Sequence, residues 1–226
     1  RALGRVGLFT QDVAGMALAA AALCQGWRDL PAPPRPPVLG VPVGPYLDQA
    51  EPAALRLFWQ QMGRLAAAGV VVREVPALDG IEALNSLHRR LVFAEFAQEH
   101  AELYASYAAL YRPRTAEIIA IGRGVSTDEI LALRENIALL RSDVEALMDA
   151  AGIDLWACPA ALGPAPAGLD ATGDPAMNLP WTHAGLPALT LPAGQAENGL
   201  PLGLQLVGRF GADETVVGWS LHLSKT

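Results

Sequence analysis

The chain has 226 residues, of which 52% are hydrophobic and only 17% are charged, and its formal net charge is −7. These values exclude intrinsic disorder, because disordered chains are poor in apolar residues and rich in charge. The acidic balance argues against a nucleic-acid partner, since nucleic acids are bound by clustered cations. The charged fraction lies below the roughly 25% that is typical of soluble domains, so we expect part of the surface to face more protein.

Membrane insertion and secretion are not indicated by the sequence. The longest apolar run, from Val13 to Cys24, has 12 residues, whereas a membrane span needs about 20, so we expect no membrane partner. The first residues do not form a secretory signal. Cys24 and Cys158 lie far apart in apolar settings. We expect two buried free thiols rather than a disulfide, and a cytoplasmic location.

The N-terminal part of the chain predicts an α/β layer. A helix is expected from Asp12 to Gly26, with Asp12 near its start and Gly26 just after its end. Two apolar, β-branched segments, Val38–Pro42 and Val70–Val75, predict strands on either side of a helix from Pro52 to Ala68. A stiff, extended connector precedes the first strand and contains Pro31, Pro33, Pro34, Pro36 and Pro37.

The middle of the chain predicts mainly helix. We expect one long helical segment from Ile81 to Tyr111, halted by Pro113. Gly122 and Gly124 are expected to break the short helix that follows.

A further helix is predicted to begin at a capping box. Ser126 would accept a hydrogen bond from the third amide of the helix while Glu129 reaches back to the cap. Apolar residues then recur at alternating spacings of three and four, at Ile130, Leu133, Ile137, Leu140, Val144 and Leu147. This spacing fits a coiled-coil seam. It lasts under three heptads, so a helix that lies on a sheet is the favoured interpretation.

The C-terminal third predicts three strands and a long loop. Asp154–Pro159 is a short buried strand, and Leu162–Asp174 is a Gly/Pro/Ala-rich loop of the kind that is either functional or disordered. Pro187–Leu191 and Leu202–Val207 predict an antiparallel hairpin whose loop contains Asn198-Gly199. The fold class is therefore α/β, a single mixed β-sheet flanked by helices.

No complete catalytic set is evident from the residues themselves. None of the six serines lies in a G-x-S-x-G turn, and none is flanked by glycines. The four histidines show no i, i+4 pair, so no metal site is predicted. His88 and His100 lie on the long predicted helix, where a solvated or hydrogen-bonded role is favoured. His183 falls in the expected loop between Asn178 and Gly185, and a structural role is favoured there too.

Three segments near the C-terminus change this assessment. Asp154–Pro159, Thr172–Gly194 and Gly199–Gly208 resemble, in order and spacing, the C-terminal region of the amidase signature family. The opening stretch from Val6 to Ala14 is similar to a Gly-Pro-containing stretch of the same family, with Phe9 and Gln11 in place of the usual Pro and Arg. The resemblance spans nearly the whole chain and is least specific in the middle helices.

The resemblance implies amide hydrolysis by a Ser–cis-Ser–Lys triad, with no metal and no organic cofactor. In the family, the triad lies in a Gly/Ser-rich N-terminal half, and the only lysine here is Lys225 near the end of the chain. No catalytic residue is therefore assigned. We expect residues 1–226 to be the C-terminal portion of a single amidase domain whose N-terminal half is not present, and we expect this stretch to be inactive alone.

The family's pocket-lining positions correspond to Met177, Asn178 and Trp181, which we predict to bind substrate. Two alternatives stay open: Trp181 as a core residue, and Asn178 as the holder of its own loop through an Asx turn. The substrate would be a small or aryl-type carboxamide, attacked through a serine acyl-enzyme. A non-catalytic module that binds a small molecule or a partner protein is the rival function.

The expected partners are the amide substrate and the missing N-terminal half, and a homodimer is left open. A related branch, the glutamine-dependent tRNA amidotransferase subunit, is disfavoured because no Gly-Tyr motif occurs between Tyr107 and Arg123.

Overall fold

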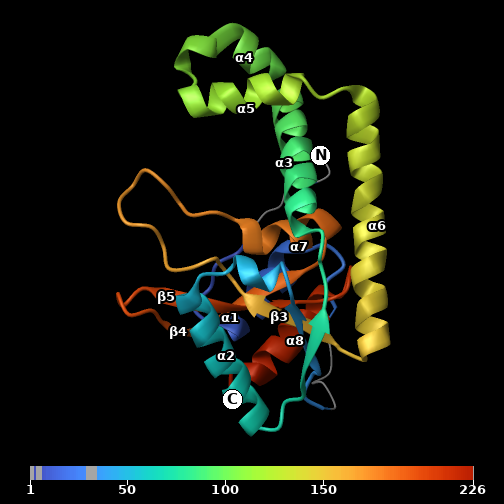
Figure 1. The fold of residues 1–226 in the computed structure, drawn as a ribbon, viewed down its shortest axis with the longest axis vertical. Helices are drawn as coiled ribbons and strands as arrows, with labels where there is room; N and C mark the ends of the chain where they lie inside the picture. Colours follow the sequence, from blue (N-terminus) through green and yellow to red (C-terminus); the bar gives the residue numbers. More distant parts are fainter. Residues whose placement is uncertain (1–2, 4–6, 29–34, 226) are drawn as a thin grey trace.

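The computed structural model describes residue 3 and residues 7–28 and 35–225, and places five strands in one sheet (Figure 1). The strands are β1 (Leu39–Val43), β2 (Val72–Pro76), β3 (Leu155–Pro159), β4 (Ala188–Gln195) and β5 (Pro201–Val207). Their order across the sheet is β2-β1-β3-β5-β4. β1 runs parallel to β2 and β3, whereas β5 is antiparallel to both β3 and β4, so the sheet is mixed. The predicted fold class is confirmed.

Both faces of the sheet are covered, and β3 shows why. Every residue of this central strand is buried. Successive side chains of a strand point to opposite faces. Leu155 and Ala157 therefore pack in one apolar cluster, and Trp156 and Cys158 pack in another. A continuously apolar strand is what a parallel pair covered on both faces requires.

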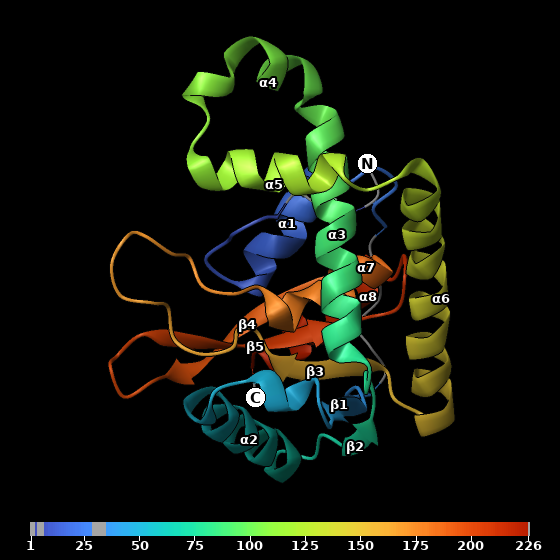
Figure 2. The ribbon, with the colours of Figure 1, turned by 45° about the horizontal axis from the view of Figure 1, so that its top comes forward.

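The two covers are supplied largely by different helices. On the Leu155 side, the cluster draws residues from α1 (Val13–Leu23), α2 (Pro52–Ala67) and α8 (Asp213–Leu223). On the Trp156 side, the cluster draws residues from α3 (Ile81–Glu99), α6 (Thr127–Ala151) and α7 (Leu179–Ala184). Figure 2 shows α3 rising from the sheet beside α6, with α7 seen between them at about the middle height of α6.

The long helical segment predicted from Ile81 to Tyr111 is wrong, because the chain bends at His100. α3 ends at Glu99, and α4 (Ala101–Tyr107) and a 3₁₀ turn, η2 (Ala108–Leu110), follow. The bend is held by aromatic contacts: His100 stacks on Phe96, and its Nδ1 lies 2.7 Å from the hydroxyl oxygen of Tyr111. The contact between His100 and Tyr111 joins residues eleven positions apart, which helix periodicity does not anticipate.

Pro113 and Gly122 also act differently from the prediction. Pro113 occupies the first turn of α5 (Pro113–Arg123), where its missing N–H costs nothing, so it begins a helix. Gly122 lies inside α5, and a Cβ there would overlap the carbonyl oxygen of Phe93 on α3. Its small size allows α5 to cross α3 closely. Gly124 caps α5 as expected.

The predicted N-cap of α6 is confirmed. The other half of the capping box, in which Glu129 reaches back to the cap, is not formed. The Ser126 Oγ accepts from the Glu129 amide at 3.2 Å. The Glu129 carboxylate pairs with Arg90 of α3. Ile130 and Leu133 bury their side chains against α3, while Val144 lies in the cluster above the sheet. The apolar face of α6 is thus buried by contacts within this chain.

The remaining predicted elements differ mainly in their ends. α1 begins after its N-cap Asp12, as predicted, but ends at Leu23, before Gly26. The hairpin of β4 and β5 is confirmed, with an irregularity between Pro192 and Gly194. Both cysteines are free; Cys158 is buried, but Cys24 is exposed, contrary to the expectation. Most of the proline connector, and Val6, lie outside the described residues. None of the described helices is long and apolar enough to cross a membrane.

Candidate functional site

Met177, Asn178 and Trp181 come together beside the carboxyl ends of β1 and β3. They lie on a 3₁₀ turn, η3 (Ala176–Asn178), and on α7. The interpretation of Asn178–Gly185 as a loop is therefore wrong. Pro180 fits the first turn of α7, and Gly185 ends it with a φ of 73°, a left-handed conformation that favours glycine.

Tyr46, which follows β1, connects this segment to the sheet. Its hydroxyl donates to the Met177 carbonyl at 2.7 Å and accepts from the Trp181 indole N–H at 2.8 Å. The Cys158 sulfur lies 3.2 Å from the same oxygen. Tyr46 is fully buried. Sequence reasoning missed this residue, because nothing in the local pattern around it signals a polar contact more than 130 positions away.

The burial of Tyr46 and Cys158 disfavours nucleophilic or basic roles for these residues at neutral pH. Burial raises the pKa of the Tyr46 hydroxyl well above its usual value of 10, and the neighbouring Cys158 adds to the effect. Burial likewise raises the pKa of the Cys158 thiol to about 12. A thiol is a nucleophile only as the thiolate. Both groups therefore act as neutral structural partners.

The Asn178 side chain is held at both ends of its amide. Its Nδ2 donates to the Ala160 carbonyl at 3.1 Å, just after β3, and its Oδ1 accepts from Gln205 of β5. Gln205 also lies 3.4 Å from the Cys158 sulfur through its Oε1. The amide thus bridges to the sheet rather than forming an Asx turn with its own loop. A glutamine between Leu204 and Leu206 in an apolar strand was the signal that could have revealed this contact.

The three predicted residues differ in exposure. Met177 is fully buried, and Trp181 is only 2% exposed. The Trp181 indole stacks on Trp156 with ring centres 6.1 Å apart and meets Tyr46 edge-on at 5.4 Å. Asn178 is the one of the three that keeps an appreciable part of its surface accessible. The Met177 and Trp181 side chains are therefore packed in the interior of the described chain.

The long predicted loop begins and ends at this place. It leaves β3 at Ala160 and returns at Asp174, whose Oδ1 accepts from the Ala176 amide at 2.9 Å. Arg89 of α3 contacts the same carboxylate at 3.3 Å. Figure 1 shows this loop extending far from the sheet. Both of its ends are therefore anchored beside Asn178.

The structure differs from the expectation for His88, which is buried rather than solvated. His88 is 5% exposed and His183 is fully buried, and their ring centres lie 5.5 Å apart. His183 Nε2 lies 3.1 Å from Asn136 Oδ1 of α6. Among the described residues, no group of three or more histidine, cysteine, aspartate or glutamate side chains is arranged to hold a metal.

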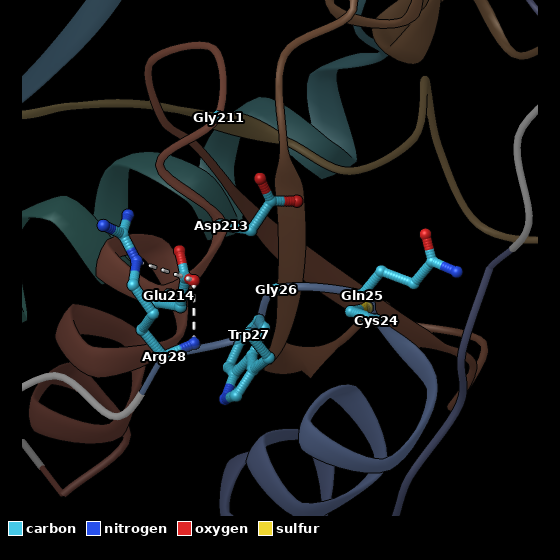
Figure 3. Close-up of a pocket in the computed structure, with 8 residues that line it drawn as sticks. All are labelled: Cys24, Gln25, Gly26, Trp27, Arg28, Gly211, Asp213 and Glu214. Carbon is cyan, nitrogen blue, oxygen red and sulfur yellow. Dashed lines mark hydrogen bonds and ion pairs between the residues drawn. The ribbon is translucent and has the colours of Figure 1, made fainter.

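A pocket lies on the other side of the sheet, between the end of α1 and the start of α8 (Figure 3). Arg28 donates its backbone amide to Glu214 at 3.1 Å, and Trp27 lies beside them. The pocket is also lined by Cys24, Gln25, Gly26, Gly211 and Asp213. None of the predicted site residues faces it.

Comparison with curated proteins shows matches to short parts of larger relatives. The chain is 49% identical over 49 residues to a glutamyl-tRNA(Gln) amidotransferase subunit of Rhodospirillum rubrum, covering 22% of the chain and 10% of that protein. It is 34% identical over 110 residues to a mitochondrial glutamyl-tRNA(Gln) amidotransferase subunit of Mycosarcoma maydis, covering 44% of the chain and 20% of that protein.

Solved structures match the fold over nearly the whole chain. The crystal structure of an amidase superposes with a TM-score of 0.82 at 24% identity, over 94% of this chain and 51% of that one. A bacterial aryl acylamidase of the amidase signature family superposes with a TM-score of 0.68 at 16% identity, over 84% of this chain and 44% of that one. The chain thus spans about half the length of these enzymes. The sequence profile of the Amidase family matches residues 2–217. The chain therefore belongs to the amidase signature family.

Proposed function

We propose that the protein carrying this chain is an amide hydrolase that acts on a small or aryl-type carboxamide through a serine acyl-enzyme. In this proposal, residues 1–226 are the C-terminal portion of a single amidase domain, and they supply the sheet scaffold and one wall of the substrate pocket. The nucleophile and its base come from a Gly/Ser-rich N-terminal half of the same domain. Membership of the amidase signature family and the likeness to an aryl acylamidase support this assignment.

The observation that carries the proposal is the fixed amide of Asn178 at the carboxyl ends of parallel strands. Ligands of α/β sheets bind in crevices at these ends. The amide is held by Ala160 and Gln205, which come from two different strands or their ends. A side chain that is already ordered loses little freedom when it binds. Asn178 is therefore suited to contact a substrate.

The chemistry of the amide suits a carboxamide. An asparagine nitrogen carries two hydrogens. Ala160 takes one of them among the described residues, so the second can donate to a substrate carbonyl oxygen. Trp181 and Met177 provide an apolar base beside this donor. A polar contact next to an aromatic wall is the usual composition of a small-molecule pocket.

The test uses the full-length protein and two amides, one aryl and one small aliphatic. We expect Asn178→Ala to lower kcat/KM by about tenfold or more, the usual order for a lost buried hydrogen bond to the reacting group. Asn198→Ala is the matched control, because Asn198 lies in the exposed hairpin loop and accepts only from the Leu200 amide among the described contacts. Equal kcat/KM values for the two variants would contradict the role of Asn178.

Trp181 is tested by substrate preference. We expect Trp181→Phe to change the ratio of kcat/KM between the aryl and the aliphatic amide. Trp156→Phe is the matched control, since Trp156 is equally buried but belongs to β3. We expect it to lower the melting temperature without changing that ratio. A Trp181 variant that loses stability and leaves the ratio unchanged would assign this residue to the core.

The rival function is a non-catalytic module that binds a small molecule or a partner protein. It follows from the absence of an assigned nucleophile within the chain. Under the main proposal, the chain alone shows no amide turnover, and Lys225→Ala changes nothing. If the chain alone hydrolysed amides and one serine replacement abolished this activity, the assignment of the nucleophile to the N-terminal half would be contradicted. A full-length product with no amidase activity that still binds carboxamides would favour the rival.

The proposal also includes a cytoplasmic location and no metal or organic cofactor. Two free cysteines are consistent with a reducing compartment. A homodimer stays a prediction, which sedimentation of the full-length protein would test.

A further inference from the structure

A second group of polar side chains is buried where α7 packs against α3. His88 and Asn85 come from α3, and His183 comes from α7. All three are less than a tenth exposed. In each, one polar atom is buried without a hydrogen-bond partner: the Nδ1 of each histidine and the Oδ1 of Asn85. An unpartnered buried polar atom is costly and calls for an explanation.

The position of this group connects it to the candidate site. Residues 181 and 183 are two apart on a helix, so their side chains point in nearly opposite directions. Trp181 faces Tyr46 and Trp156 at the sheet, whereas His183 faces His88 on α3 and Asn136 on α6. The segment from Asn178 to Trp181 is thus held from below by the sheet and from above by the histidine pair.

The electrostatic surroundings favour neutral histidines. Burial, with smaller contributions from His183 and Arg89, lowers the pKa of His88 to about 4. Burial also lowers the pKa of His183. The charged groups around the pair are Arg89 on α3, which contacts Asp174 of the loop, and Arg141 on α6, which donates to the Ala184 carbonyl on α7. A proton on the His88 ring would add a positive charge near Arg89, and a proton on the His183 ring would be buried.

We propose that His88 and His183 are positioning residues of the candidate site: as an uncharged pair they dock α7 against α3 and α6, and protonation of either ring releases α7. The catalytic consequence rests on the proposed function, because α7 and η3 carry the proposed pocket wall. The sign follows from linkage. A histidine whose pKa is lower in the docked state binds a proton preferentially in the released state, so docking weakens as pH falls below about 6.5.

The principal experiment compares the full-length protein with a variant carrying His88→Gln and His183→Gln. Glutamine is neutral at every pH, and its amide nitrogen can reach the position of a histidine Nε2, which preserves the donor to Asn136. Docking is followed by the exciton circular dichroism of the stacked Trp156 and Trp181 rings. We expect the wild type to lose this signal on acidification. The equilibrium constant for docking should fall by up to about tenfold per pH unit for each proton bound. In the variant, the midpoint should fall by at least about one pH unit.

The matched control is His100→Gln, because His100 contacts Tyr111 in the helical arm and lies outside the pair. We expect it to keep the wild-type acid profile. A second measurement needs no variant to fold: the NMR titration of the His88 Cε1–H signal, which should remain that of a neutral ring down to about pH 5. Titration of His88 near pH 6.5, or identical acid profiles for the wild type and the double glutamine variant, would overturn the proposal.

Amide turnover, measured in parallel, separates this inference from the proposed function. If the dichroism and kcat/KM shift together in the double variant, both are supported. If the dichroism midpoint shifts and kcat/KM does not, the histidines dock α7 but α7 is no pocket wall. Their positioning role and the pocket-wall part of the proposed function then fail, while amide hydrolysis itself stands. If kcat/KM responds to Asn178→Ala while the acid profiles coincide, the proposed function stands and the histidine pair does not position it.

Discussion

The sheet and the helical arm use apolar residues in opposite ways. In β1 and β3, nearly every side chain is buried. In the helical arm, which comprises α4, η2 and α5 (residues 101–123), α4 and η2 contain no buried residue at all. Leu103, Tyr107 and Leu110 of the arm are each more than half exposed. Figure 1 shows the arm standing apart from the sheet at the far end of α3.

This difference shows where the stability of the described chain resides. Apolar burial contributes about 25 cal/mol per Å² of surface removed from water, so side chains that stay exposed contribute little. The sheet region also holds its polar groups in a connected network through Tyr46 and Gln205. The arm is tied to the body mainly through α3 and the close approach at Gly122. Substitutions in the two regions should therefore differ strongly in cost.

The largest effect is expected for Trp156→Ala. Trp156 is fully buried in the central strand and stacks on Trp181. Truncation of a buried tryptophan leaves a cavity and costs about 3–5 kcal/mol of unfolding free energy. Chemical denaturation checks this value. A loss below about 1 kcal/mol would mean that the sheet is not the stable part of the molecule.

Tyr46→Phe tests the polar network without creating a cavity. The change removes only the hydroxyl, which leaves the Trp181 N–H and the Met177 carbonyl without their shared partner. We expect a loss of about 1–3 kcal/mol, the usual cost of an unsatisfied buried group. The same denaturation experiment on Tyr107→Phe in the arm provides the control. Equal losses for the two tyrosines would remove the distinction between the regions.

Asp154→Asn is expected to lower stability by about 1–2 kcal/mol at neutral pH. Asp154 joins the start of β3 to β1: its carboxylate accepts from the Val38 amide at 2.7 Å and pairs with Arg35. Burial of the carboxyl opposes its ionisation, but the hydrogen bonds from Arg35 and Val38 outweigh burial and hold its pKa below the ordinary value. A lowered pKa in the folded state stabilises the fold above about pH 4.

That contribution is lost as pH falls through the folded-state pKa. The difference in unfolding free energy between the wild type and Asp154→Asn should therefore be present at pH 7 and shrink below about pH 4. Thermal unfolding across this range measures it. A difference that stays constant with pH would show that the carboxylate charge is not what holds the strand.

The smallest effect is expected for Leu110→Gln in the arm. Leu110 is 81% exposed, so replacement by a polar residue should change the unfolding free energy by less than about 0.5 kcal/mol. A larger loss, measured in the full-length protein, would show that another part of that protein covers the arm. Leu91→Gln on α3, where the side chain is fully buried, is the contrasting control.

The sequence by itself determined the elements whose residues carry local signals. The β-branched and apolar segments predicted all five strands, the hairpin at Asn198-Gly199 and the mixed sheet, because burial on both faces demands continuous apolar runs. The N-caps at Asp12 and Ser126 were also predictable, since capping depends on neighbouring residues. The segments Asp154–Pro159 and Gly199–Gly208 further indicated the family.

The tertiary structure alone decided the contacts between distant segments. Nothing near His100 predicts that Tyr111 folds back onto it, and nothing near Gly122 predicts the approach of Phe93. The same holds for the candidate site. Tyr46 lies 135 positions from Trp181 in the sequence, and His88 and His183 meet only because α7 lies against α3. Periodicity describes which face of an element is apolar, but side-chain hydrogen bonds depend on which element packs against that face.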